Sequence, residues 1–222
     1  MIPGFQVGRL PVAPLTWQIG TRADFREAFE RAAAGFLLLA ALPVLAVSGL
    51  AIFALSGRSP LIAHRRVGLN GRDLWVWKLR TMWRRRGAYD ARLLEYIADD
   101  DGPARKSPGD RRVMCGFARF CRRHSIDELP QLLNVVRGEM ALIGPRPVTR
   151  REMRQIFGAA AEEIVRVKPG ITGLWQVSGR NRLTAAQRRA LDLELVRRRS
   201  PGMCASILLR TLPELIGGNN SW

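Results

Sequence analysis

Two adjacent carboxylates are the first residues in this sequence that could carry chemistry. Asp127 and Glu128 lie in the segment Ser125–Gln131, directly after an arginine-rich stretch. A carboxylate near cations stays ionised, and an ionised carboxylate acts as a nucleophile or as a metal ligand. The alternative is a capping box, in which Ser125 begins a helix and Glu128 bonds back to its start. Pro130 favours a helix that begins later than Ser125, because a proline inside a helix removes a backbone hydrogen bond.

A second candidate is the arginine that lies between two prolines. Arg146 follows Pro145 and precedes Pro147. Each proline fixes its own φ, and the second proline drives the residue before it into extended backbone. A guanidinium on such a stiff loop suits phosphate binding, because it presents a planar fork of N–H donors. A plain turn with a surface arginine is the alternative interpretation.

The third candidate is a glycine-rich segment near the C-terminal quarter of the chain. Residues Lys168–Asn181 read KPGITGLWQVSGRN. Glycines permit positive φ and close backbone approach, which is the geometry of an anion-binding nest. The spacing is neither that of a P-loop nor that of a dinucleotide-binding fingerprint. Ordinary turns between short strands would explain the same glycines.

The charge of the chain restricts the partners of these candidates. The sequence has 222 residues and a formal net charge of +17, and all but three of its 36 Lys and Arg residues are arginine. Arginine-rich basic proteins bind phosphate in nucleic acid, in anionic lipid or in phosphorylated substrates. Hydrophobic residues make up 47% of the chain, enough for a folded core. The three cysteines lack Cys-x-x-Cys spacing, so neither a disulfide framework nor a zinc site is predicted.

One uncharged, apolar stretch covers residues 32–55. As a straight helix it would be about 36 Å long, which is enough to cross a bilayer core of about 30 Å. Pro43 lies near the middle of the stretch and predicts a kink or a break. The stretch is therefore either a kinked spanning helix or a hairpin that enters one leaflet and returns. Arginines on both sides favour two cytoplasmic ends, and hence the hairpin.

Turn signals and periodicity predict the elements that must position the candidate residues. Asn70-Gly71 between β-prone residues predicts a hairpin over residues 64–82. A helix followed by a variable loop is expected over residues 84–110. A basic amphipathic helix is expected over residues 113–124 and an apolar helix over residues 204–216, and both are suited to a membrane surface.

Together, five ordered segments resemble the bacterial sugar transferase family. The resemblance is to its short form, the monotopic phosphoglycosyl transferases that begin lipid-linked glycan and exopolysaccharide synthesis. The segments are RRVGLNG (65–71), KLRTM (78–82), SIDELPQLLN (125–134), GEMALIGPRP (138–147) and KPGITGLWQVSGRN (168–181). Three positions depart from the residues usual in the family: Glu139 and Ala141 stand where Asp and Ser are usual, and Leu195 replaces a common Tyr.

The resemblance implies an α/β-type, mixed α+β, cytosolic catalytic domain over residues 56–222. An amphipathic segment over residues 1–31 and a re-entrant membrane helix-hairpin over residues 32–55, broken at Pro43, would precede it, and amphipathic helices would lie at the interface. The implied reaction transfers a sugar-1-phosphate from a UDP-sugar to polyprenyl (undecaprenyl) phosphate and releases UMP. The catalytic domain would lie on the cytoplasmic side of the bacterial inner membrane, bound to one leaflet, without a nucleic-acid partner, as a monomer or a homo-oligomer.

The resemblance also implies roles for individual residues. Asp127 would be the nucleophile that forms a covalent aspartyl-phosphosugar intermediate. Glu128 would be its neighbour at a Mg²⁺ that both carboxylates bind. The residues expected to bind substrate phosphate are Arg146, Lys78, Arg80 and Arg180. The rival interpretation is a non-enzymatic, membrane-tethered basic module that binds nucleic acid or anionic lipid, and it gives the carboxylate pair no role.

Overall fold

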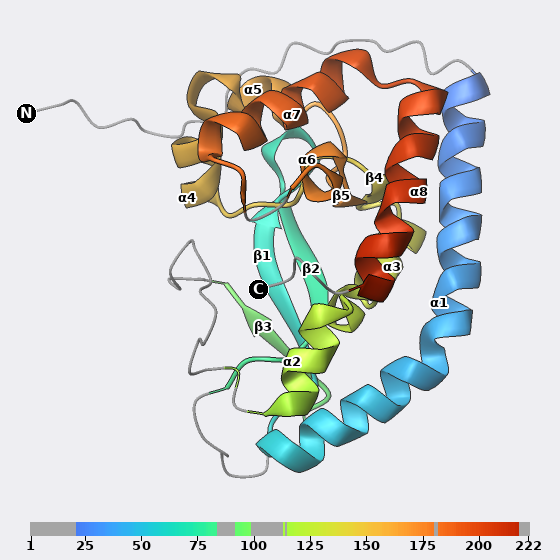
Figure 1. Ribbon diagram of the computed structural model, residues 1–222, viewed down its shortest axis with the longest axis vertical. Coiled ribbons are helices and arrows are strands. Elements are labelled where there is room, and N and C mark those ends of the chain that lie inside the picture. Colours follow the sequence, from blue (N-terminus) through green and yellow to red (C-terminus); the bar gives the residue numbers. More distant parts are fainter. Residues whose placement is uncertain (1–20, 84–91, 99–112, 114, 180–181, 218–222) are drawn as a thin grey trace, which may run out of the picture.

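The computed structural model describes residues 21–83, 92–98, 113, 115–179 and 182–217. Two small sheets lie among the helices (Figure 1). One sheet has the strand order β2 (Asp73–Leu79), β1 (Leu61–Val67), β3 (Leu94–Ile97), with β3 at the periphery. The other sheet pairs β4 (Ala141–Ile143) with β5 (Gly170–Thr172). The mixed α+β class expected from the sequence is confirmed.

The predicted hairpin is present. Strand β1 (Leu61–Val67) pairs antiparallel with β2 (Asp73–Leu79), so that Leu61 faces Leu79 and Val67 faces Asp73. The connection contains Asn70 with φ 54° and Gly71 with φ 71°. Two successive residues with positive φ are what the right-handed twist of a tight hairpin requires, and Asn-Gly adopts them with little strain.

Strand β3 corrects a prediction. Residues Leu94–Ile97 form this strand, which runs parallel to β1. The sequence predicted a helix and a loop over residues 84–110, and for the described residues 92–98 that prediction is wrong. The short strand depends on pairing with the edge of β1, a tertiary contact that outweighs local preference. Residues 84–91 and 99–112 lie outside the described residues.

The second sheet brings two glycine-containing segments into direct backbone contact. Strand β4 (Ala141–Ile143) runs parallel to β5 (Gly170–Thr172). A Cβ on Gly144 would lie 2.6 Å from the carbonyl oxygen of Lys168, and one on Gly170 would lie 2.6 Å from the Cα of Gly144. No side chain fits at either position. The glycines thus allow the loop that carries Arg146 to pack on the glycine-rich segment.

Helix α1 (Thr21–Ser56) contains the whole apolar stretch and 36 residues in all. It remains helical through Pro43, and Figure 1 shows that it bends partway along its length. A proline inside a helix removes a backbone hydrogen bond and produces such a kink. The break expected at Pro43 is thus a bend within one continuous helix. Large apolar side chains on this helix are exposed, among them Phe36, Leu39, Val47 and Leu50.

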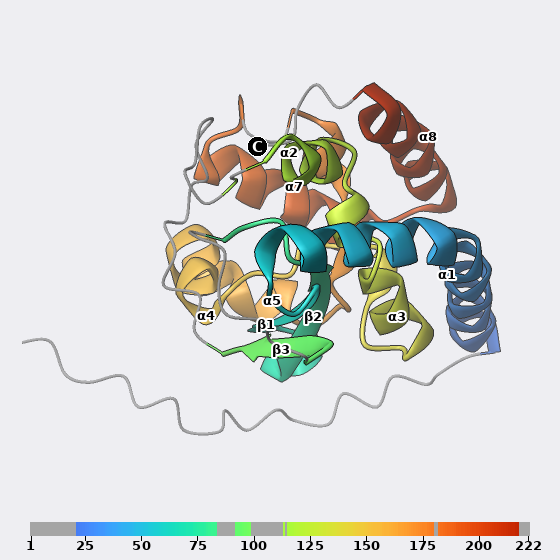
Figure 2. The ribbon, with the colours of Figure 1, turned by 90° about the horizontal axis from the view of Figure 1, so that it is seen from below.

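The remaining helices pack around the sheets (Figure 2). The basic helix predicted over residues 113–124 is confirmed as α2 (Gly116–Arg123), and the apolar helix predicted over residues 204–216 is confirmed within α8 (Pro201–Gly217). One buried core cluster joins α1, β2 and α3 through Ala34, Val76 and Val135. The helices after β3 are α2 (Gly116–Arg123), α3 (Gln131–Val136), α4 (Arg150–Glu152), α5 (Ala161–Ile164), α6 (Leu174–Val177), α7 (Ala185–Arg198) and α8 (Pro201–Gly217).

Candidate functional site

Two cations from distant segments meet at Glu128. The Nζ of Lys78, on β2, donates to Oε1 of Glu128 over 2.9 Å. The Nη2 of Arg146, in the loop after β4, donates to the same oxygen over 2.8 Å. None of the three side chains is more than 30% exposed. Partial shielding from water strengthens the attraction between these charges. The structure thus brings Lys78 and Arg146 together at Glu128, and their contact with phosphate stays a prediction.

The charges at this site are fixed by their neighbours. Burial acts to raise the pKa of Glu128, but the charges and hydrogen bonds of Arg146 and Lys78 outweigh it and hold that pKa well below its usual value. In return, the negative charge of Glu128 raises the pKa of Arg146. Glu128 is therefore an anion and Arg146 a cation at neutral pH.

Asp127 lies one residue before Glu128 in the short 3-10 turn Ile126–Glu128, and its side chain is buried. Its negative charge helps to raise the pKa of Arg146. Burial, and after it the charge of Asp127, raises the pKa of Cys121 on α2 to about 11. The charge of Asp127 thus acts both on Arg146 and on Cys121 of α2.

The capping-box interpretation is wrong. Ser125 has a positive φ of 54°, and its side chain makes no capping hydrogen bond to any residue that the structure describes. Helix α3 begins at Gln131, directly after Pro130, as the proline predicted. Glu128 is therefore free of a capping role, and its carboxylate faces Lys78 and Arg146 instead.

Asn134 is a positioning residue that sequence reasoning missed. It is completely buried on α3. Its Oδ1 accepts a hydrogen bond from the backbone N–H of Trp77 over 3.2 Å, and its Nδ2 donates to the carbonyl of Trp75 over 2.8 Å and to Oε2 of Glu139 over 2.7 Å. β2 is an edge strand, so its outer backbone groups have no neighbouring strand to bond to. The Asn134 amide bonds to these groups instead, directly before Lys78. The available signal was one amide inside the apolar run of α3.

A further predicted phosphate ligand, Arg80, contacts partners outside this cluster. Arg80 is buried, its Nε donates to the carbonyl of Ser59 over 2.8 Å, and its guanidinium pairs with Glu95 on β3. These contacts tie the end of β2 to the connection between α1 and β1. A contact of Arg80 with substrate phosphate stays a prediction, and Arg180 lies outside the described residues.

The carboxylate pair could hold a magnesium ion only together with other ligands. Within the described part of the chain, no group of three or more His, Cys, Asp or Glu could hold a metal by itself. Mg²⁺ commonly uses one or two carboxylates together with substrate phosphates. Asp127 and Glu128 are adjacent, and the hydrogen bonds from Lys78 and Arg146 occupy one oxygen of Glu128. Phosphate oxygens would have to complete the coordination shell.

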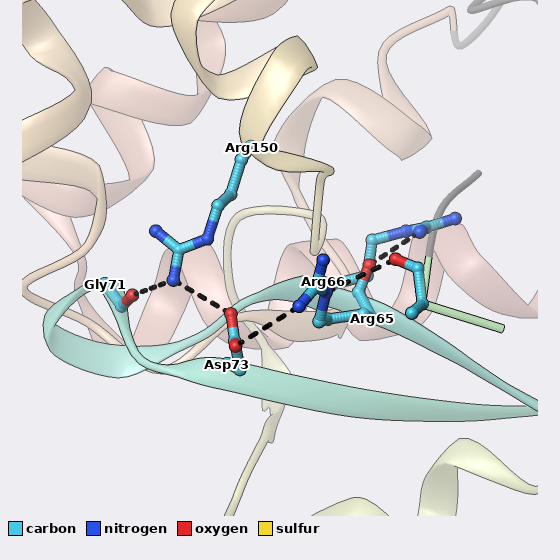
Figure 3. A network of polar contacts seen from close by, with 6 residues as sticks. Arg65, Arg66, Gly71, Asp73 and Arg150 are labelled. Atoms are coloured by element: carbon cyan, nitrogen blue, oxygen red, sulfur yellow. Dashed lines mark hydrogen bonds and ion pairs between the residues drawn. The ribbon is translucent and has the colours of Figure 1, made fainter. Parts of the chain in front are cut away.

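A polar network fixes the hairpin turn relative to the Arg146 loop (Figure 3). Arg150, at the start of α4, donates to Oδ1 of Asp73 over 2.8 Å and to the carbonyl of Gly71 over 3.2 Å. Arg65 pairs with the same carboxylate at 3.9 Å. Exposed pairs of this kind contribute little stability each, so their effect is to orient the turn against α4.

Comparison with known proteins gives the chain relatives along most of its length. The bacterial sugar transferase family matches residues 21–218. The chain is 37% identical over 204 residues to the exopolysaccharide production protein ExoY of Sinorhizobium fredii, covering 89% of this chain and 88% of that protein. It is 35% identical over 206 residues to the UDP-glucose:undecaprenyl-phosphate glucose-1-phosphate transferase of Caulobacter vibrioides, covering 89% of this chain and 72% of that one.

A third relative is longer than this chain. The undecaprenyl-phosphate glucose phosphotransferase of Komagataeibacter xylinus is 38% identical over 208 residues, which are 89% of this chain and 37% of that protein. The rival interpretation of a non-enzymatic basic module is wrong, because the matched family and these relatives are transferases. The match over nearly the whole length, the carboxylate pair and the two cations that meet at Glu128 lead to one conclusion: this chain belongs to the bacterial sugar transferase family of enzymes.

Proposed function

We propose that this enzyme transfers a sugar-1-phosphate from a UDP-sugar to undecaprenyl phosphate and releases UMP. The observation that carries the proposal is the contact of Lys78 and Arg146 with one oxygen of Glu128, beside the buried Asp127. Both substrates are anionic, and the two cations offset the repulsion between them. The names of several relatives include undecaprenyl phosphate as acceptor, and one includes UDP-glucose as donor.

The arrangement suits a two-step transfer through Asp127. In the first step, a carboxylate oxygen of Asp127 forms a bond to the phosphorus next to the sugar, and the bond from that phosphorus to the UMP oxygen breaks. UMP leaves with the electron pair. In the second step, a phosphate oxygen of undecaprenyl phosphate attacks the same phosphorus and releases the Asp127 carboxylate. Arg146 and Lys78 stabilise the negative charge on the phosphoryl oxygens in both steps.

Mg²⁺ is the expected cofactor of this transfer. Asp127 and Glu128 would hold it, and when bound it would neutralise charge on the phosphate oxygens. Glu128 would also keep Lys78 and Arg146 at fixed positions, through the hydrogen bonds that it accepts from both. A cofactor role for Mg²⁺ predicts that a chelator abolishes turnover and that added Mg²⁺ restores it.

The contacts of α1 support a re-entrant topology on the cytoplasmic side of the inner membrane. Near the N-terminal end of α1, Glu27 pairs with Lys168 at 2.7 Å, and Arg31 donates to the carbonyl of Val136 over 2.9 Å. The other end of α1 continues into β1 after a short connection. Both ends of the apolar stretch thus lie next to the same domain, which supports two ends on the same side of the membrane.

The proposal is tested by UMP release from a panel of UDP-sugars. The full chain is purified in detergent and assayed with Mg²⁺, with and without undecaprenyl phosphate. We expect multiple turnovers with one UDP-sugar only when the lipid acceptor is present. Asp127→Asn should abolish turnover, whereas Glu194→Gln, a matched change at an exposed acid of α7, should not. An inactive wild-type protein across the whole panel, although folded, would refute a UDP-sugar donor.

A further inference from the structure

Arg188 is a second arginine near the site, and two of its N–H donors have no hydrogen-bond acceptor among the described residues. Arg188 lies on α7, and its guanidinium carbon is 4.4 Å from the centre of the Trp175 ring, over the ring face. Its Nε and Nη2 are buried and have no hydrogen-bond acceptor among the residues that the structure describes. The side chain keeps 16% of its surface exposed. The two nitrogens are thus buried N–H donors that lack the hydrogen bonds which such groups usually make.

The carboxylate closest to Arg188 does not satisfy it. Asp192, one turn further along α7, is completely buried, and its Oδ2 is 4.0 Å from the Nε of Arg188. This is an ion pair, but the distance is too long for a hydrogen bond. Neither carboxylate oxygen of Asp192 has a hydrogen-bond partner in the described part of the chain. Buried charges without hydrogen bonds are costly, so this pair gains from any group that supplies them.

The cluster of Trp175, Arg188 and Asp192 adjoins the Arg146 loop. A Cβ on Gly173 would lie 2.5 Å from the carbonyl oxygen of Gly144, so the segment that carries Trp175 packs directly on the loop that carries Arg146. Burial lowers the pKa of Arg188, and the positive charge of Arg146 lowers it further. The two guanidinium groups are thus close enough to repel each other.

We propose that Arg188 is a second anion-binding arginine of this site, which binds one phosphate of a diphosphate donor while Arg146 binds the other. Stacking on Trp175 uses the face of the guanidinium and leaves its edge, which binds phosphate in a bidentate manner. An anion between Arg146 and Arg188 removes their repulsion. Asp192 is then a positioning residue that keeps Arg188 over the Trp175 ring. The identity of the donor rests on the proposed function, but the anion site itself does not.

The inference is tested with inorganic pyrophosphate and orthophosphate as probes, which involve neither sugar nor nucleoside. Binding to the full chain in detergent is measured by calorimetry for wild type, Arg188→Gln and Arg189→Gln. Arg189 is the exposed neighbour on the same helix and serves as the matched control. We expect wild type to prefer pyrophosphate, and Arg188→Gln to lose about tenfold in pyrophosphate affinity, equivalent to about 1.4 kcal/mol, with a smaller effect on orthophosphate. Arg189→Gln should change neither affinity.

Other outcomes separate this inference from a structural ion pair and from the proposed function. If Arg188→Gln does not fold, Arg188→Lys keeps the charge without the planar fork and should lose the same preference for pyrophosphate. A purely structural role predicts a lower unfolding temperature with an unchanged ratio of the two affinities, and that result overturns the inference. Equal affinities of wild type for the two anions overturn it as well. A protein that prefers pyrophosphate through Arg188 but releases no UMP contradicts only the proposed function.

Discussion

Glu27 on the N-terminal part of α1 lies 2.7 Å from Lys168, the first residue of the glycine-rich segment. The pair links α1 to the segment that packs on Gly144, and hence to the Arg146 loop. A side chain at the beginning of the apolar helix thus contacts the same domain that follows its end. The position of this helix relative to a bilayer is open to a direct test.

The test uses two engineered cysteines in a background from which Cys115, Cys121 and Cys204 have been removed. We expect Thr21→Cys and Arg58→Cys to be shielded from a membrane-impermeant thiol reagent in intact cells, because both ends of α1 contact the same domain. Both should react after permeabilisation, which is the control for accessibility. Labelling of the Thr21 site alone in intact cells would establish a spanning helix and exclude the re-entrant one.

Arg146→Lys keeps the charge of the loop that is proposed to bind phosphate but removes its fork of donors. We expect a loss of about 2 kcal/mol or more in transition-state stabilisation, measured as a decrease in kcat/KM of roughly thirtyfold. Lysine donates from a single nitrogen and cannot form two parallel hydrogen bonds to phosphate. Arg151→Lys, at an exposed position on α4, is the matched control. Near-normal turnover of Arg146→Lys would mean that this loop is only a turn.

Local chemistry explains which parts of the fold the sequence could predict. The hairpin of β1 and β2 follows from Asn70 and Gly71, whose positive φ values are a property of those residue types. The short strand β3 was missed, because it exists through pairing with β1 and its own residues do not specify it. The bend of α1 was predictable from Pro43, whereas the choice between a kinked continuous helix and a broken one stayed open.

In the candidate site, too, some features follow from local sequence and others depend on tertiary contacts. The residue types of Asp127 and Arg146 indicated their chemistry, but the choice between a cap and a charge cluster at Glu128 depended on Lys78, which is distant in sequence. No local sequence pattern indicates that Lys78 lies next to the turn that contains Glu128. Asn134 was missed for a related reason. It bonds to backbone atoms of β2, and the residue types in the sequence do not indicate which backbone atoms a side chain will contact.

Asn134 gives a prediction about the stability of the site. Asn134→Ala would leave the N–H of Trp77 and the carbonyl of Trp75 without this partner, and we expect a loss of about 2 kcal/mol or more in the free energy of unfolding. Asn134→Asp keeps the shape but loses the donor and faces Glu139, so it should be destabilised as well. The measurement is thermal unfolding, with Gln155→Ala at an exposed position as control. Unchanged unfolding of both Asn134 variants would contradict this role.

Asp192 predicts a pH dependence of stability. Burial raises its pKa from 3.8 to about 7, although the charges of Arg188 and Arg146 act to lower it. Between these two values the folded state binds more protons than the unfolded state, so the contribution of Asp192 to the free energy of unfolding falls as pH rises and levels off above about 7. Its limiting slope is about 1.4 kcal/mol per pH unit. The difference in unfolding temperature between wild type and Asp192→Asn should therefore change across this range. A constant difference would show that the carboxyl group does not titrate there.

The role of Asp127 distinguishes two mechanisms. In the proposed one, its carboxylate attacks phosphorus, and in the competing one it acts only as a base while undecaprenyl phosphate attacks the UDP-sugar directly. The two differ before the acceptor is added. With UDP-sugar and Mg²⁺ alone, the covalent mechanism releases up to one UMP per enzyme molecule, because UMP leaves when the bond to Asp127 forms.

The adduct itself is measured by mass spectrometry of the peptide that contains Asp127. We expect a mass increase of one hexose phosphate after incubation with a UDP-hexose donor, and loss of that mass when undecaprenyl phosphate is added. Asp127→Asn should remove both the adduct and the acceptor-independent UMP, since an amide is a poor nucleophile, while Glu194→Gln should retain both. The buried position of Asp127 requires that Asp127→Asn be shown to fold and to remain membrane-bound. If UMP appears only with the lipid acceptor and no adduct forms, Asp127 is not the nucleophile.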